Sequence, residues 1–307
     1  MQTVKRQVDM EKDSALVLKE LFDRKQLNKA EDARELLGRS KLVEKLLVEP
    51  KKGPQTFVGL RAIEWRLLEL SEIPFSESLP EVQEWLRLLT DRTHTKEGFS
   101  LTGERDGMLA CHNAMITRIL IRMRPHEKEK IDDGIRWILE YQSTERGADC
   151  KWSGKDLYTR WGGCMKKTPC YYGVVKSVAA LSEYAERIAR LKEVGAKLQA
   201  GLEYMLRHKL FRRLSTGEPI EKSIVENFYP YPYKTNLIEM LALLKRNKLS
   251  SDPRAQEAAE LLRSAQRSDG YWQTDASFMK SAWVDFDGQK KPGLWITYIV
   301  KKILEDA

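Results

Sequence analysis

Apolar residues recur at helical spacing along nearly the whole chain, and the alternation typical of strands is scarce. The first fifty residues predict three short helices, over 12–22, 29–37 and 41–47, and Pro50 stands just after the last of them. No linker-like composition separates this segment from the rest of the chain. The pattern therefore predicts an all-α fold in which residues 1–50 form a helical extension packed on a larger body, residues 51–307.

From Phe57 onward, helices are expected in pairs that repeat at a regular interval. In each pair an inner-type segment, rich in apolar and small residues, precedes an outer-type segment that is amphipathic and more charged. Subtraction gives separations of 51, 62, 62 and 61 residues between the inner-type segments, which begin near Phe57, Met108, Cys170, Pro232 and Gly293. The outer-type segments span 79–89, 129–142, 191–206 and 252–266. Such a period is typical of stacked helical hairpins.

Hairpins of this length can stack as an open superhelix or close into a ring, an α/α toroid. The last repeat, which begins at Gly293, supplies an inner-type helix and no outer-type one. We expect the N-terminal helices to complete this layer and therefore favour the closed toroid. The open superhelix is the alternative, because nothing in the repeat itself specifies the curvature.

Composition narrows the class of protein only modestly. Hydrophobic residues make up 42% of the 307 residues and charged residues 32%, as in ordinary folded proteins. No apolar run approaches the roughly 18 residues that a membrane span needs, and residues 1–14 lack the apolar core of a signal peptide. We therefore expect a cytoplasmic protein. The net charge of +8 favours an anionic partner, but basic and acidic residues are interspersed on most helices, which argues against a nucleic-acid surface.

The four cysteines lie at the start of one inner-type segment and in the connection to the next: Cys111, Cys150, Cys164 and Cys170. In a toroid every connection from an outer to an inner helix lies at the same end of the ring, so the four thiols can converge. Four thiolates can form a closed tetrahedral Zn²⁺ site or hold an iron-sulfur cluster. Because no C-x-x-C pair is present, thiols without a metal and disulfides are the alternatives. Adjacent helical positions point about 100° apart, so His112 suits the cavity lining better than the metal.

Aromatic residues gather where inner-type helices begin and in the connections that precede them. Together with His112, we predict that they line a central pocket for an apolar ligand, although packing between helices would explain them equally well; they are Tyr171, Tyr172, Tyr231, Tyr233, Trp283 and Trp295. Asp285 and Asp287 precede the last inner-type helix and are the candidate catalytic acids. The sequence contains no phosphate-binding glycine loop, no serine-histidine-aspartate signature and no H-E-x-x-H.

The segment 266–272 reads Q-x-x-D-G-x-W, which resembles the QW motif of triterpene cyclases, and a weaker copy lies at 142–152. Together with the repeat length, over about residues 57–307, the chain resembles the terpenoid cyclase and protein prenyltransferase superfamily. It is most similar to little-characterised microbial prenyltransferase-like proteins that carry cysteines at the corresponding helix starts. The resemblance implies an α/α toroid with a central cavity for an isoprenoid-like ligand.

The chain departs from the catalytic patterns of that superfamily at two places. Protein prenyltransferases hold a catalytic zinc with aspartate, cysteine and histidine and work with a partner subunit, whereas Cys170 stands here where the histidine is expected. Class II cyclases use D-x-D-D, of which residues 285–288 are an incomplete match. Two functions therefore stay open. One is a cyclase or transferase in which Asp285 or Asp287 supplies the acid, and the other is a non-enzymatic, metal-stabilised binding or scaffold protein with an acidic protein or nucleic-acid partner.

Overall fold

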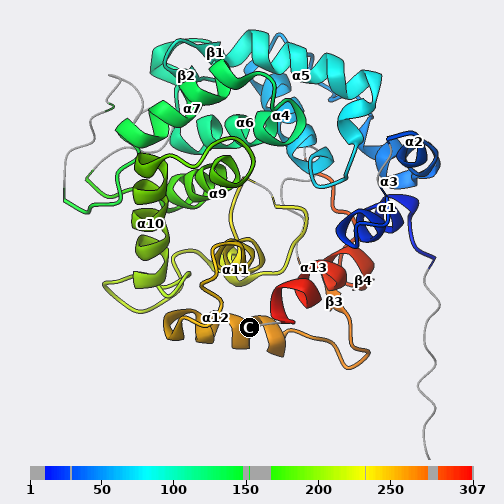
Figure 1. The fold of residues 1–307 in the computed structure, drawn as a ribbon. Helices are drawn as coiled ribbons and strands as arrows, with labels where there is room; N and C mark the ends of the chain where they lie inside the picture. The colour runs from blue at the N-terminus through cyan, green and yellow to red at the C-terminus, as the bar shows by residue number, and fades with distance from the viewer. Residues whose placement is uncertain are drawn as a thin grey trace, which may run out of the picture.

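The computed structural model describes residues 11–27, 30–147, 152, 167–231, 233–275 and 283–305. These residues are mainly helical (Figure 1), which confirms the all-α prediction. The strands form two short antiparallel ribbons, in which β1 (His94–Thr95) pairs with β2 (Gly98–Phe99) and β3 (Trp272–Gln273) pairs with β4 (Pro292–Gly293). None of the described helices is both long and apolar enough to cross a membrane.

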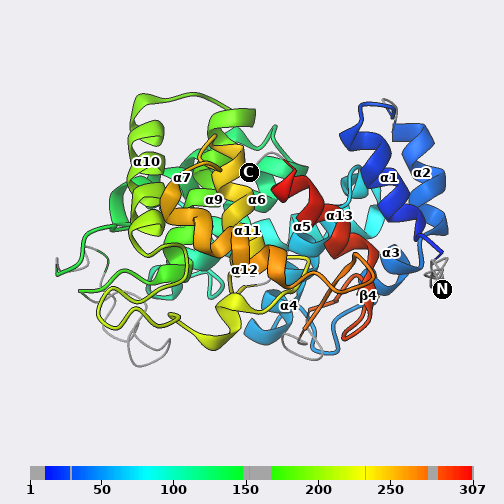
Figure 2. The same ribbon diagram turned by 90° about the horizontal axis from the view of Figure 1, so that it is seen from below.

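Three short helices form the N-terminal segment, as predicted: α1 (Ser14–Asp23), α2 (Ala30–Arg39) and α3 (Lys41–Leu46). Asp13 caps α1 by accepting a hydrogen bond from the amide of Ala15, and Ser40 caps α3 by accepting one from the amide of Val43. The Ser40 hydroxyl also donates to the Asp13 carboxylate, so the two caps hold α1 and α3 together. Figures 1 and 2 both place these helices at the edge of the molecule opposite α10 (Lys192–Arg207).

The paired helices show the predicted alternation. The inner-type helices are α4 (Phe57–Leu70), α6 (Ala110–Met123), α9 (Tyr171–Arg187), α11 (Leu237–Arg246) and α13 (Leu294–Leu304). The outer-type helices are α5 (Pro80–Thr93), α7 (Lys128–Tyr141), α10 and α12 (Gln256–Ser264). In Figure 1 the inner-type helices lie around the middle of the molecule and the outer-type helices lie outside them. The largest difference between a predicted and an observed helix start is at α11. The repeat pattern placed this start near Pro232, whereas the helix begins at Leu237, directly after its cap, Asn236.

Neighbouring inner-type helices run parallel to one another. Near the start of α6 and α9, a side chain at Gly173 would come within 3.0 Å of the Ala110 methyl group, so the two helices approach closely there. Near their ends, Arg122 of α6 and Arg246 of α11 each form a 2.7 Å ion pair with Glu183 of α9. The C-terminal ends of α6, α9 and α11 therefore meet at one end of the molecule.

The Q-x-x-D-G-x-W segment ties the end of an outer-type helix to the next inner-type helix. The Trp272 indole donates a 2.8 Å hydrogen bond to the carbonyl of Leu262 in α12. The Trp272 amide donates a 2.8 Å bond to the Thr297 hydroxyl in α13. Gln266 closes the loop between them by donating to the carbonyl of Gly270. In the weaker copy, Trp152 packs edge-on against aromatic rings of α7.

Side-chain contacts hold α13 between the N-terminal helices and α11. The Tyr298 hydroxyl and the Lys302 ammonium group both donate to Asp23 at the end of α1, at 2.8 and 2.7 Å. Just before α13, the amide of Val284 donates a 2.8 Å bond to the buried Glu69 carboxylate in α4. The first two contacts join α13 to α1, and the third joins the segment before α13 to α4, so the N-terminal segment packs beside the last inner-type helix.

Candidate functional site

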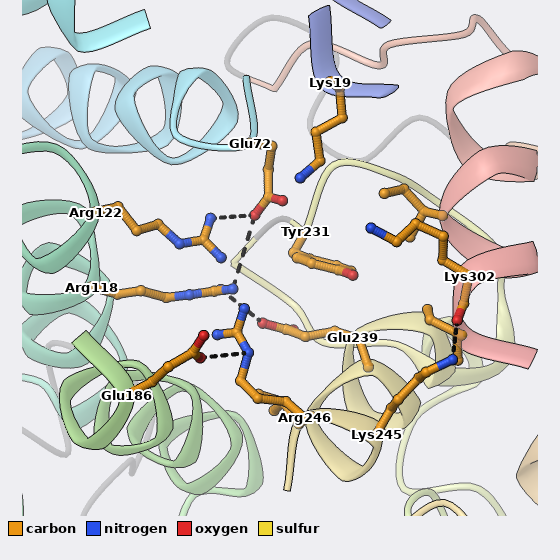
Figure 3. Close-up of a pocket in the computed structure, with 14 residues that line it drawn as sticks. Lys19, Glu72, Arg118, Arg122, Glu186, Tyr231, Glu239, Lys245, Arg246 and Lys302 are labelled. Carbon is orange, nitrogen blue, oxygen red and sulfur yellow. Dashed lines mark hydrogen bonds and ion pairs between the residues drawn. The ribbon is translucent and has the colours of Figure 1, made fainter. Parts of the chain in front are cut away.

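A cavity of about 440 Å³ lies at the C-terminal ends of the inner-type helices, and we call it the central pocket. Figure 3 shows its charged side chains converging from α1, α6, α11 and α13. The charged lining consists of Lys19, Arg118, Arg122, Lys245, Arg246, Lys302, Glu72, Glu186 and Glu239. An apolar wall is formed by Ala242, Leu243, Ile299 and Ile303. The central pocket thus combines an excess of cationic groups with one hydrophobic side.

Arg118 and Arg122 are spaced four residues apart on α6 and therefore point to the same side of the helix. Arg122 contacts Glu72 at 2.6 Å and Glu183 at 2.7 Å, and Arg118 contacts Glu183 at 2.8 Å. Burial by itself would raise the pKa of Glu183, but the two guanidinium groups outweigh it and hold that pKa well below its usual range. Both arginines are thus fixed in position by carboxylates before any ligand arrives.

Two lysines, Lys19 in the lining of the central pocket and Lys176 beside its residue Glu239, lie in a poorly solvated environment. Lys176 of α9 forms a 2.7 Å ion pair with Glu239 of α11, and both side chains are buried. Burial lowers the pKa of Lys176, and Glu239 opposes this shift. Burial likewise lowers the pKa of Lys19 despite the 3.1 Å contact of its ammonium group with Asp23. A further anion would stabilise the charged form of Lys19.

Tyr231 is the aromatic side chain of the central pocket. It lies among the charged groups in Figure 3, and the Arg118 guanidinium carbon is 5.8 Å from the centre of its ring. Burial raises the pKa of Tyr231, so its hydroxyl stays protonated and can donate a hydrogen bond. Of the seven residues predicted to line a pocket, Tyr231 is the one that lines this cavity.

The predicted metal ligands are only partly within the described residues. Cys111 is buried in the first turn of α6, and Cys170 directly precedes α9, so both lie at the end of the inner-type helices opposite the central pocket. Burial raises the pKa of the Cys111 thiol, and the nearby Cys170 raises it further. Cys150 and Cys164 lie outside the described residues. In the part of the chain that the structure describes, no three histidine, cysteine or acidic side chains form a possible metal site.

His112 belongs to a buried polar group near these cysteines. Its Nδ1 atom is 2.7 and 2.9 Å from the two carboxylate oxygens of Glu64 in α4. Its ring stacks on Tyr233, with centroids 5.6 Å apart and planes at 18°, and Tyr172 packs edge-on against Tyr233. Burial raises the pKa of Tyr172 to about 12. The structure thus brings these three predicted residues together, but at the cysteine end of the molecule.

The other predicted aromatic residues pack between secondary-structure elements. Tyr171 donates a hydrogen bond from its hydroxyl to the carbonyl of Leu210 and packs against α10. Trp295 stacks on Tyr229, with ring centroids 6.1 Å apart, and Trp283 lies edge-on to a neighbouring phenylalanine. Their positions match the packing alternative that the sequence left open.

Asp285 and Asp287 hold the start of α13 in place. The two Asp287 oxygens accept 2.8 Å hydrogen bonds from the amides of Trp295 and Ile296. Asp285 accepts bonds from the Asp287 amide at 3.0 Å and from the Thr274 hydroxyl at 3.3 Å. Burial raises the pKa of Asp287 to about 6. Neither carboxylate lines the central pocket, and their role as acids stays a prediction.

Sequence reasoning missed the charged groups of the central pocket. The available signal was the presence of charged residues inside otherwise apolar segments, such as Arg118 in α6, Glu183 in α9 and Glu239 in α11. Charged side chains are rarely buried unless they are paired. Such residues on several consecutive inner-type helices could have indicated a shared polar centre.

No family model, curated protein or solved structure matches the chain. The resemblance to terpenoid cyclases and prenyltransferases therefore stays an expectation of the sequence. Interpretation of the site depends on its own geometry.

Proposed function

We propose that the chain binds a small amphiphilic anion in the central pocket. The observation that carries this proposal is the set of six lysine and arginine side chains around a cavity with an apolar wall. Ammonium and guanidinium groups bind phosphates and carboxylates through charge-assisted hydrogen bonds. Cavities of about 300 to 1,000 Å³ are typical of small-molecule sites. The anionic head would meet the cations, and the apolar portion would lie against Leu243 and Ile299.

We also propose that the fold is an α/α toroid. The parallel inner-type helices and the contacts of Asp23 with Tyr298 and Lys302 support closure between α13 and α1. An isoprenoid-like anion, which the resemblance to prenyltransferases and cyclases suggests, has the amphiphilic character that the lining favours. The alternative of a scaffold with an acidic protein partner would use the same cations without needing the apolar wall.

Farnesyl phosphate is a suitable probe, and we expect it to bind much more tightly than farnesol. The phosphate can interact with the cations, while both molecules present the same apolar chain. Lys302→Gln should weaken the binding of farnesyl phosphate at least about tenfold, because a charge-assisted hydrogen bond contributes about 1.5–3 kcal/mol. Titration calorimetry at two salt concentrations measures these affinities.

Lys301→Gln is the matched control, because Lys301 is the exposed neighbour on the same helix and does not line the cavity. This variant should bind farnesyl phosphate as the unmodified chain does. Equal affinity for farnesol and farnesyl phosphate, or equal effects of the two lysine substitutions, would overturn the proposed function.

A second proposal concerns the thiols. Cys111 and Cys170 lie close enough for a charge on one to raise the pKa of the other, and we propose that they bind Zn²⁺ together with Cys150 and Cys164. Elemental analysis of anaerobically purified protein should then find about one zinc per chain, with less in a Cys164→Ser variant. Iron with sulfide would indicate a cluster instead, and protein without metal would refute the site.

A further inference from the structure

A second cavity, of about 190 Å³, adjoins the central pocket, and we call it the head-group pocket. The two cavities share Lys19, Glu72, Arg122 and Arg246 in their lining. The head-group pocket lies where α1, residues 71–77 and the ends of α6 and α9 meet, and it adds Arg187 among its cations. Because they share these four residues, the two cavities lie side by side.

Arg187 differs from the neighbouring arginines in its pairing. Arg122 and Arg246 each form a 2.7 Å ion pair with Glu183. Arg187 is the last residue of α9, it is exposed to solvent, and no carboxylate of the described residues lies within ion-pair distance of it. Partial burial lowers the pKa of Arg187; the charge of Glu183 opposes this shift, and the charges of Arg122 and Arg246 add to it. A guanidinium group that lies beside two others and forms no direct ion pair with a described carboxylate can bind an external anion.

The charges around the two cavities do not balance. The central pocket contributes six cations and three glutamates, and the head-group pocket adds Arg187 and Glu77. Three further charged residues form ion pairs with members of the two linings: Lys176 with Glu239, Asp23 with Lys19, and Glu183 with Arg122. Within the part of the chain that the structure describes, this set holds more cations than carboxylates. A phosphate monoester carries about two negative charges and three acceptor oxygens, so it suits a lining rich in cations better than a singly charged carboxylate does.

We infer that the head-group pocket binds the phosphoryl group of a phosphate ester, with Arg187 as a direct ligand. The planar guanidinium group of Arg187 can offer paired N–H donors to phosphate oxygens, while Arg122 and Arg246, already paired with Glu183, add positive charge beside it. The inference rests on the proposed function, because the organic part of the ester would occupy the central pocket. Beyond the proposed function, the inference specifies that the anionic group of the ligand is a phosphoryl group and that Arg187 binds it.

Inorganic pyrophosphate is the probe for the head-group pocket alone, because it has phosphoryl groups and no apolar part. We expect it to bind the unmodified protein and to compete with farnesyl phosphate. Arg187→Gln should weaken the binding of pyrophosphate about tenfold and Arg187→Lys about threefold, because lysine keeps the charge but loses the forked donors. Arg190→Gln, which replaces an exposed arginine outside both linings, should change it less than twofold.

The variants separate this inference from the proposed function. If farnesyl phosphate binding responds to Lys302→Gln while pyrophosphate binding is unchanged in Arg187→Gln, the phosphoryl inference is wrong and the proposed function stands. If pyrophosphate binding depends on Arg187 but farnesyl phosphate binds no better than pyrophosphate, the phosphoryl site stands and the apolar part of the proposed function is wrong. Vesicles containing phosphatidic acid test whether the phosphate ester is a membrane lipid. If the protein binds these vesicles but not the soluble probes, and this binding depends on Arg187, the phosphoryl group belongs to a lipid head group.

Discussion

Replacement of Glu183 by alanine should lower the free energy of unfolding by about 3–5 kcal/mol, the usual cost of removing one partner from a buried ion pair. The Glu183 side chain is fully buried and lies 2.7–2.8 Å from guanidinium groups of Arg118, Arg122 and Arg246. Without Glu183, the positive charges of these three arginines would be less well compensated in a region with little water, which destabilises the folded state. Urea unfolding monitored by circular dichroism measures the change in the free energy of unfolding, which is obtained from the midpoint urea concentration and from the slope of the free energy against urea concentration.

Glu186→Ala is the matched control for this prediction. Glu186 lies on the same helix, is 56% exposed and is 3.5 Å from Arg246. Because exposed ion pairs contribute about 0–1 kcal/mol, this variant should be nearly as stable as the unmodified protein. Similar losses in the two variants would show that the buried network does not depend on Glu183.

The contribution of Glu69 to the free energy of unfolding should fall as the pH rises from about 4.5 to about 8. Burial raises the pKa of this carboxyl group from 4.5 to about 8, although Arg66 opposes the shift. The folded state therefore retains a proton that the unfolded state has lost, so stability from this group is full below pH 4.5, declines through the interval and is constant above about pH 8. The slope is at most about 1.4 kcal/mol per pH unit.

Glu69→Gln isolates this contribution, because the amide oxygen can still accept the hydrogen bond from Val284 and carries no titrating charge. The variant should lose most of the decline in unfolding free energy between pH 5 and pH 8. Glu49→Gln, at an exposed carboxylate, should keep the decline. Identical pH profiles for the unmodified protein and Glu69→Gln would contradict the buried state of Glu69.

The helices could be predicted from the sequence because the signals that specify them are local. Apolar spacing and caps such as Ser40 lie within a few residues of the helix that they define. The exception, the start of α11, depends on Asn236 rather than on Pro232, near which the repeat pattern placed it. Local chemistry thus accounts for the order of the helices.

The candidate site could not be predicted in the same way, because its members are far apart in the sequence. Arg118, Glu183 and Arg246 meet only when three inner-type helices pack side by side. The position of Asp287 near α13 was visible in the sequence, but the use of both its oxygens by backbone amides was not. The aromatic residues could not locate the pocket either, because aromatic side chains are equally suited to packing between helices and to cavity walls.

The most direct test of the proposed function is a crystal structure of the full chain with farnesyl phosphate. The account predicts that the phosphoryl group lies within hydrogen-bond distance of Arg187 and Lys19, with the farnesyl chain against Leu243 and Ile299. A ligand bound on the outer surface, or a central pocket that admits no ligand at saturating farnesyl phosphate, would contradict it.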